Sequence, residues 1–551
     1  MPPQIYDPST MNITDLSKVT ETPVQLSKYA QALIKDYLSG APQGHPPNIP
    51  KISVSQTVSF AAFLYEKMRN AIEYREDHLI RRASIERILK RRLVLNQNGA
   101  DIAEPLIKEM LWARYLENNT IPEDKITQIQ EVIDKYFYLR NEFMVGRSTQ
   151  DREKIGSWII DVASCEIEER LSPDLRRVAF TNYVYHMLRT QLNLFEDGGS
   201  RDVQVYIAVE RAFAKSDDPL IRYHLLKLLA PELVSGNWQN AQKILPQFSG
   251  IYDKIEKDLI HSQADSLRRF VKKQSPPFLI LRDLFEQYPK NIEEILSSEE
   301  KLLYRVDEIC RRRYSQTQSK LRRAGVRSFI YIVLTKVVFA LALEVPYDVY
   351  ISHMVSYLPI GINVLFPPIF MSGIILTTSV PGVDNTRRIQ TRIKQILEED
   401  PDSGPRQDEH IMGRKVKVKS PLLNFGFSAI YFLGFFLSFG FIIYILTKLH
   451  FSIVSQAVFI FFLTLVTFFA YRIRLIAREY LVVEKEGILD PVGDFFMLPL
   501  LRVGQWLSGE IAKINLFIFI FDFVIEAPFK AIFEVVDEWI HFVKIKKDEM
   551  V

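Results

Sequence analysis

The fold of this chain is decided by the stretch SFIYIVLTKVVFALALEVPYDVY, residues 328–350, which is apolar enough to cross a membrane. A helix needs about 20 such residues to span the hydrocarbon core of a bilayer. Lys336 nevertheless lies near the middle of the stretch, and Glu344 and Asp348 lie toward its end. Either the charges serve a function inside the bilayer, or the span is placed differently from the apolar run.

Three further apolar runs follow in the second half of the chain. With the first, they cover residues of about 328–347, 355–380, 424–447 and 451–470. Prolines and glycines inside such runs, as at Pro367, are tolerated better in membrane helices than in soluble ones. The sequence therefore predicts a transmembrane region, 326–475, with four spans arranged as two hairpins.

Basic residues flank these runs on one side only. Lys and Arg are frequent before the first run, in the loop 381–421 and after the fourth run, whereas the 345–354 loop has none and the 448–450 turn has only Lys448. Segments rich in Lys and Arg stay in the cytoplasm. We therefore expect both termini and the basic loop 381–421 to be cytoplasmic, in a plasma or inner membrane.

The first half of the chain has a different pattern. Residues 1–50 are rich in proline and are expected to form a flexible tail, with a short helix at 26–39. From residue 51 to 325 the pattern is helical; apolar residues recur at steps of three and four from Val54 to Ile72. No segment alternates at period two, so we predict an all-α protein with a cytoplasmic all-helical domain and almost no sheet.

The C-terminal segment, 476–551, is predicted to form amphipathic or interfacial helices on the cytoplasmic side. Asp522, Glu526, Lys530 and Glu534 follow one another at four-residue steps, which places a polar stripe along an otherwise apolar helix. Such a helix suits the membrane interface, or packing on a membrane domain, better than lipid on all sides. A fifth span at 514–533 and a re-entrant hairpin remain as alternatives.

Composition excludes several classes of protein. The 551 residues include 69 basic and 66 acidic ones, a net charge of +3, so we expect no nucleic-acid partner. The two cysteines, Cys165 and Cys310, are too few for a disulfide framework or a Cys-based zinc site. The N-terminus has neither the basic nor the apolar region of a signal peptide.

Motifs for catalysis or cofactor binding are not found in the sequence. The glycine pair at 198–199 lacks the Lys-Ser/Thr of a phosphate-binding loop, and no HExxH motif occurs. The sequence thus gives no catalytic, metal or cofactor residue, and we expect no cofactor. Catalytic groups can also converge from helices far apart in the sequence, but no motif supports an enzyme, and the sequence favours a non-enzymatic protein.

Two basic segments are candidates for contact with anionic lipid. One is RRASIERILKRR at 81–92, and the other is CRRRYSQTQSKLRRAGVR, directly before the first span. Basic residues gain roughly 1 kcal/mol each beside an anionic membrane surface. The candidates are Arg81, Arg82, Arg91, Arg92, Arg311, Arg312, Arg313, Arg322 and Arg323. For the first segment the alternatives are a solvated face of a core helix or nucleic-acid contact; for the second, a topology signal alone is sufficient.

Polar residues inside the spans form the remaining candidate site: Lys336, Glu344 and Asn363. Lys336 is expected to extend its amine to the cytoplasmic interface or to pack against a partner there. Glu344 lies eight positions further along, about 12 Å on a regular helix, so we expect no pair between the two within one helix.

The leading functional hypothesis is a non-enzymatic, multi-pass integral membrane protein. Its cytoplasmic helical domain would act as a scaffold or regulatory interaction module, with membrane lipids and either a protein partner or a second copy of the chain as partners. The alternative is a transporter or channel component with a path near Lys336, Glu344 and Asn363. A lipid-modifying enzyme is a third hypothesis.

Overall fold

The structure is a computed structural model and describes the chain in segments. They are 24–40, 49–55, 76–95, 99–193, 198–235, 238–350, 357–378, 380–402, 410–411, 421–482 and 490–513, with the single positions 59, 63, 66, 535, 539 and 542. Nearly all of the helix predicted after Val54, most of the second half of the basic loop and the polar stripe at 522–534 lie outside these residues.

The chain forms two compact units. We call residues 1–28, 273–400 and 413–516 the span unit, and residues 29–272, 401–412 and 517–551 the helical unit. The boundary at 272/273 falls inside helix α12 (Ala264–Gln287), whereas the sequence placed the end of the cytoplasmic domain near 325.

The helical unit consists of helices, as expected for an all-α protein. Along the chain these are α1 (Lys28–Ser39, all but its first residue), α3 (Asp77–Leu95), α4 (Ala103–Trp112), α5 (Asp124–Phe143), α6 (Thr149–Leu171), α7 (Leu175–Arg189), α8 (Gly198–Val209), the π-helix η3 (Glu210–Ala214), α9 (Asp218–Leu229), α10 (Pro231–Ser235) and α11 (Trp238–Leu259). The strands of the described residues, β1 (Leu192–Asn193) and β2 (His410–Ile411), pair in parallel over two residues each.

One hydrophobic core holds most of the helical unit together. It extends from Ile52 to Leu259 and includes the buried faces of α3 to α6, α9 and α11. Phe248 of α11 packs edge-on against Trp158 of α6 and Phe143 of α5, with ring centroids 5.8 and 4.9 Å apart. Edge-to-face pairs of this kind stabilise a core by about 0.5–1.5 kcal/mol beyond their buried area.

The short helix expected in the tail is present as α1. Its buried residues, Ala30, Leu33, Ile34 and Tyr37, recur at steps of three and four and so share one face. Tyr37 meets Phe180 of α7 edge-on at 5.8 Å. Part of the segment expected to be a flexible tail therefore packs on the helical unit.

The span unit is organised around one long helix. It contains α13 (Ile292–Ser297), α14 (Glu299–Phe339), the π-helix η4 (Ala340–Glu344), α15 (Val345–Tyr350), α16 (Tyr357–Thr377), α17 (Val383–Glu398), α18 (Pro421–Lys448), α19 (Ile453–Ala477) and α20 (Asp490–Lys513). Helix α14 continues without a break through η4 and α15 to give 52 helical residues from Glu299 to Tyr350. At 1.5 Å per residue this is about 78 Å, more than twice the thickness of a bilayer core.

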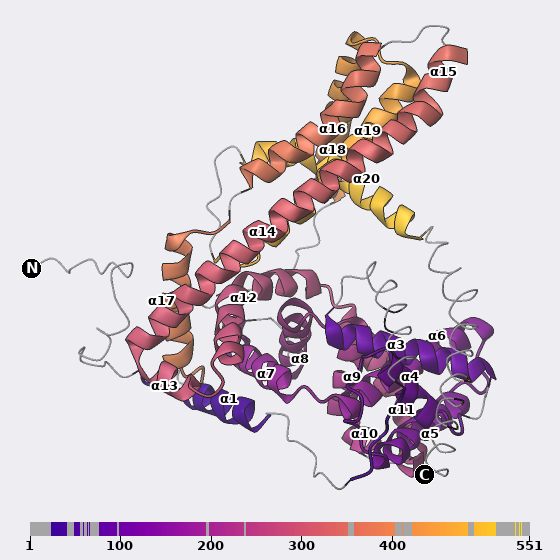
Figure 1. Ribbon diagram of the computed structural model, residues 1–551, viewed down its shortest axis with the longest axis vertical. Coiled ribbons are helices and arrows are strands. Elements are labelled where there is room, and N and C mark those ends of the chain that lie inside the picture. The colour runs from indigo at the N-terminus through magenta and orange to yellow at the C-terminus, as the bar shows by residue number, and fades with distance from the viewer. Residues whose placement is uncertain are drawn as a thin grey trace, which may run out of the picture. The chain divides into compact units, whose positions relative to one another are not determined.

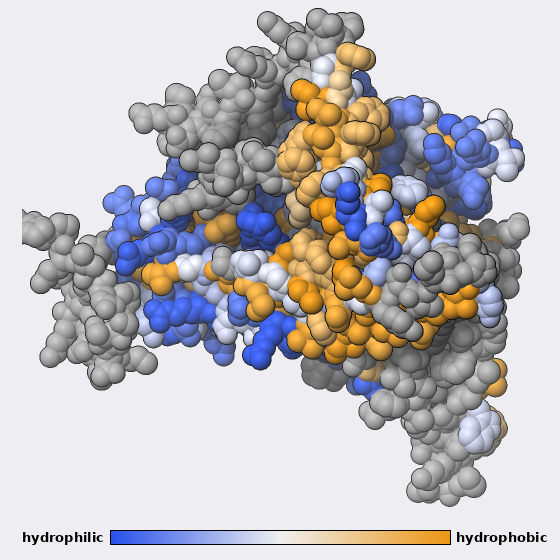
Figure 2. All heavy atoms as spheres, turned by 90° about the horizontal axis from the view of Figure 1, so that it is seen from above, coloured by the Kyte–Doolittle hydropathy of each residue, from blue (hydrophilic) through white to orange (hydrophobic). Residues whose placement is uncertain are grey.

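The four apolar runs are confirmed as four long apolar helices. The candidate spans are the upper part of Glu299–Tyr350, Leu358–Thr377, Ser428–Lys448 and Ile453–Ala477, and they gather at one end of α14 (Figure 1). Leu334, Phe432 and Phe436 are exposed on these helices, and Figure 2 shows the broad hydrophobic surface that such residues form. In lipid, this surface needs no further cover.

The basic loop predicted at 381–421 begins with a helix, α17. Ile389, Ile393, Ile396 and Leu397 are buried along one face, and the basic residues lie on the others. The apolar spacing of three and four was present in the sequence, but the prediction treated 381–421 only as the connection between two spans.

Helix α20 packs on the candidate spans at about the middle of their length. Ser438, near the middle of α18, donates a hydrogen bond of 3.2 Å to the carbonyl of Phe496. Gly504 lies so close to α19 that an added Cβ would stand 2.2 Å from the carbonyl oxygen of Thr464. Small residues at helix crossings in membranes allow such close approach. The segment 514–533, for which an interfacial or packed helix, a fifth span or a re-entrant hairpin was considered, lies outside the described residues.

The contact at Gly504 gives a first prediction. Gly504→Ala places a methyl group against the backbone of Thr464, and we expect a loss of roughly 1–3 kcal/mol in the free energy of unfolding. Thermal unfolding in nanodiscs measures the change. Gly509→Ala on the same helix is the control, because nothing lies within 4 Å of its added Cβ. Equal stability of the two variants would contradict the packing of α20 on α19.

Candidate functional site

The three polar residues predicted inside the spans meet in the span unit. Lys336 on α14 donates from Nζ to Oδ1 of Asn363 on α16 at 2.5 Å. Nδ2 of Asn363 donates to Oε2 of Glu344 at 2.6 Å and to the carbonyl of Ser455 on α19 at 3.2 Å. All three side chains are fully buried. One amide thus joins a cation, an anion and the backbone of a third helix.

Lys336 and Glu344 form an ion pair, and the expectation that they would not was wrong. Their Nζ and Oε1 atoms lie 3.5 Å apart. The estimate of about 12 Å assumed a regular α-helix, but residues 340–344 form the π-helix η4. A π turn takes more residues per revolution, so Glu344 returns to the face that carries Lys336. The two long side chains then close the remaining distance.

The surroundings of the cluster are arranged to hold both charges. The ammonium of Lys336 stands over the ring of Phe462, 4.5 Å from its centroid, as in cation–π contacts. Ser455 donates from Oγ to Oε2 of Glu344 at 3.4 Å. The other oxygen, Oε1, faces Lys336 as a charge partner but has no hydrogen bond. The cluster is neutral as a whole, and this removes most of the cost of placing a single charge in lipid.

Helix α16 contributes a second polar feature beside Asn363. Pro367 and Pro368 lie inside the helix, and neither has the N–H that the carbonyls of Asn363 and Val364 would accept in a regular turn. The helix nonetheless continues from Tyr357 to Thr377 without a break. The proline pair therefore leaves polar backbone near the cluster and does not divide the span.

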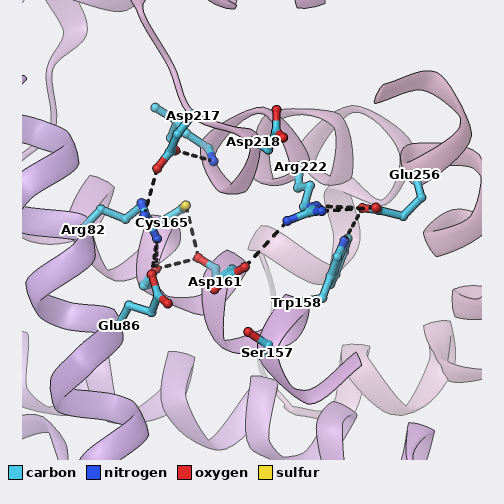
Figure 3. A network of polar contacts seen from close by, with 12 residues as sticks. Arg82, Glu86, Ser157, Trp158, Asp161, Cys165, Asp217, Asp218, Arg222 and Glu256 are labelled. Carbon is cyan, nitrogen blue, oxygen red and sulfur yellow. Dashed lines mark hydrogen bonds and ion pairs between the residues drawn. The ribbon is translucent and has the colours of Figure 1, made fainter. Parts of the chain in front are cut away.

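The basic segment at 81–92 faces carboxylates inside the helical unit. Arg82 is buried, and its guanidinium lies 2.8 Å from both Glu86 and Asp217 (Figure 3). Glu168 pairs with Arg81 at 2.8 Å, and Glu109 pairs with Arg91 at 2.5 Å and with Arg92 at 3.0 Å. These arginines are therefore paired with carboxylates of the protein itself, whereas the sequence had suggested them as candidates for contact with anionic lipid.

The network around Arg82 joins four helices. Asp161 of α6 faces Arg222 of α9, which pairs with Glu256 of α11 at 2.7 Å, and Trp158 of α6 donates to the same Glu256 carboxylate at 2.8 Å (Figure 3). Burial, together with the nearby Glu86 carboxylate, raises the pKa of Asp161 to about 7. A carboxyl with a pKa near 7 suits proton transfer. Its neighbours, however, are ion-pair partners from the packed helices, so we interpret the network as a structural link between α3, α6, α9 and α11.

Two further buried clusters were not found from the sequence. Lys135 pairs with Glu166 at 2.8 Å, with both side chains inside the core. Glu210, at the start of η3, accepts a hydrogen bond from Ser216 at 2.5 Å and contacts Nδ1 of His224 at 3.1 Å. Burial alone would raise the pKa of the Glu210 carboxyl, but the charge and hydrogen bond of His224 outweigh it and lower this pKa to about 2. In this order the carboxylate separates the serine from the histidine, so the histidine does not activate the hydroxyl.

The arginines before the first span fall into two groups. Arg313 forms a two-pronged ion pair with the buried carboxylate of Asp283, and Arg311 pairs with Asp307 at 2.7 Å. Arg312, Arg322 and Arg323 are exposed on α14. Of these, Arg322 and Arg323 lie closest in sequence to the apolar run and remain candidates for lipid contact.

Neither cysteine nor any cluster of ligands indicates redox or metal chemistry in the described segments. Burial raises the pKa of the Cys165 thiol well above its usual range and that of Cys310 to about 12, so both stay protonated. Among the residues that the structure describes, no group of three or more His, Cys, Asp or Glu side chains is placed to hold a metal ion.

Comparisons with known proteins add no functional information. No protein-family model matches the chain, and searches of curated proteins and of solved structures give no match.

The ion pair in the span unit gives a second prediction. Removal of one member of a buried pair leaves the other charge unpaired and costs about 3–5 kcal/mol, whereas replacement of both is close to neutral. We therefore expect Lys336→Met and Glu344→Gln each to destabilise the protein strongly, and the double variant to recover most of the loss. Thermal unfolding in nanodiscs provides the measurement; additive losses in the double variant would contradict the pairing.

Proposed function

We propose that this chain is a multi-pass integral membrane protein whose large helical region before the first candidate span, residues 51–325, acts as a scaffold or regulatory interaction module on the cytoplasmic side. The four candidate spans and their one-sided basic flanks support this proposal. The partner is a cytosolic protein or a second copy of the chain. Both termini lie on the cytoplasmic side, with lipid around the spans.

The observation that carries the proposal is the continuity of α14. The same helix includes the first candidate span and extends below it, from Glu299 to Arg327, beside α13 and α17 (Figure 1). A continuous helix moves as a body when its end in the membrane shifts or rotates. It therefore gives the membrane region a direct mechanical link to the residues below it, as a regulatory module requires.

A solute path near Lys336 is the alternative function, and the contacts favour a lock between helices instead. The ammonium, the amide and one carboxylate oxygen all have partners within the protein, and the three side chains are fully buried. Residues that line a path exchange such contacts for water or substrate. The transporter hypothesis would be supported if the reconstituted protein showed a flux of ions or small solutes that Lys336→Leu abolished.

The proposed topology gives a third prediction. Cysteines introduced at His353 and His450 should react with a membrane-impermeant maleimide added to intact cells, because both positions follow the outer ends of spans. Glu398→Cys, on the exposed face of α17, should react only after permeabilisation. Cys165 and Cys310 are buried, so the natural chain supplies a low background. Labelling of the cysteine at 398 in intact cells would show that α17 lies outside the cell and would contradict the proposed orientation.

The scaffold proposal gives a fourth prediction. A photo-crosslinking amino acid at Leu228 or Ile260, both exposed on the helical unit, should capture a discrete protein partner in living cells. The same amino acid at Leu376, which is exposed on α16, should capture lipid and is the matched control. If neither position on the helical unit yields a protein adduct, the interaction module is not supported.

A further inference from the structure

A basic cavity lies in the span unit between α12, α17 and the segment that follows α19. Its volume is about 340 Å³, and it is lined by Lys273, Gln274, Pro277, Arg387, Arg388, Thr391, Arg392, Gln395 and Val482. Four of these residues are cations and none is acidic. Cavities of this size are at the lower end of the range for small-molecule sites.

The cavity is shaped by contacts that fix its walls. Asn385, in the first turn of α17, donates to the carbonyl of Tyr480 at 2.7 Å and accepts from the N–H of Val482 at 2.9 Å. Arg387, Arg388 and Arg392 lie on two turns of α17, outside the face that its buried isoleucines form. Lys273 reaches the same cavity from α12. The cations therefore converge from two helices held by packing and hydrogen bonds.

The charges in the cavity differ from the others in the same unit. Elsewhere in it, Lys394 pairs with Glu299 at 2.7 Å, Lys301 with Glu294 at 2.9 Å, and Arg313 with Asp283. For Lys273, Arg387 and Arg388, by contrast, the described segments supply no carboxylate within ion-pair distance. Like charges in one cavity repel each other, and an anion in the cavity would relieve that repulsion.

The position of the cavity along α14 separates it from the membrane surface. Asn385 and Gln390 of α17 donate hydrogen bonds to Tyr314 and to the carbonyl of Leu303, both at 2.8 Å, so this part of α17 runs beside residues 303–314 of α14. Tyr314 is about 20 Å before Arg327, where the apolar run begins. A helix tilt of about 40° shortens this depth to about 15 Å. Head groups extend only roughly 5–8 Å beyond the hydrocarbon core.

We propose that this cavity binds a small soluble anion that carries two or more phosphate groups. The arginine guanidinium groups are suited to phosphate oxygens, which they bind in a two-pronged geometry. Thr391, Gln274 and Gln395 add neutral donors on the cavity wall. None of the described residues that line the cavity is aromatic, so recognition rests on the phosphates rather than on stacking with a base. Binding here would place a cytoplasmic ligand against α17 and α12, next to the long helix of the spans.

Calorimetric titration of the full chain with pyrophosphate, in nanodiscs of neutral phosphatidylcholine, tests the proposal. We expect saturable binding that weakens as salt is raised, and a loss of at least ~10-fold in affinity for the double variant Arg387→Gln/Arg388→Gln. The control is Arg322→Gln/Arg323→Gln, which removes the same charge from an exposed arginine pair on α14 and should bind pyrophosphate as the natural chain does.

A second arm identifies the source of the phosphate. Nanodiscs with phosphatidylglycerol should stabilise the natural chain and the Arg387/Arg388 variant equally, and the Arg322/Arg323 variant less. The proposal is overturned if the natural chain binds no pyrophosphate, if both variants lose affinity equally, or if stabilisation by phosphatidylglycerol depends on Arg387 and Arg388. Melting curves in neutral nanodiscs confirm that each variant is folded before titration.

Discussion

The contact of the Lys336 ammonium with the Asn363 amide and the Glu344 carboxylate is the interaction on which the span unit depends. Hydrocarbon offers no water to a polar group, so a charge in a span must find its partner inside the protein. Here the partners come from the first and second candidate spans, and the backbone of Ser455 in the fourth completes the set. Apolar packing alone leaves helices in lipid free to slide or rotate, because lipid tails are as apolar as leucine. A buried polar contact forms in only a few relative positions of the helices, and so it fixes how they pack.

Buried cations are also paired with carboxylates in the helical unit, outside the candidate spans. In the helical unit, Arg82 and Lys135 are withdrawn from water; Arg82 pairs with Asp217 at the start of α9, and Lys135 of α5 pairs with Glu166 of α6. Such pairs add little net stability, but they penalise any packing that separates them. In the cavity beside α17, the described segments supply no carboxylate to Lys273, Arg387 or Arg388, and the proposed anion would take that place. Paired cations thus link packed helices, whereas the cations of the cavity carry the proposed binding of an anion.

Features that depend on neighbouring residues in the sequence were predicted, whereas contacts between residues far apart in the sequence were not. Four spans and the short helix α1 were predicted, because apolar runs and helical spacing are local signals. The sequence also singled out Lys336, Glu344 and Asn363, since polar residues stand out in an apolar run. Their pairing was missed, because the π turn at 340–344 leaves no sequence signal that spacing rules detect. The partner of Arg82, Asp217, is 135 residues away, and only the fold brings the two together.

The most direct test of this account measures the contact between Lys336 and Glu344 in lipid. Solid-state NMR on nanodisc samples, with ¹⁵N in the lysine side chains and ¹³C in the glutamate carboxyl groups, detects nitrogen–carbon pairs in direct contact. The account predicts a dipolar coupling from the Lys336 amine to a carboxyl carbon that disappears in Glu344→Gln. A spectrum that is unchanged in this variant, or that shows no such coupling in the natural chain, would contradict it.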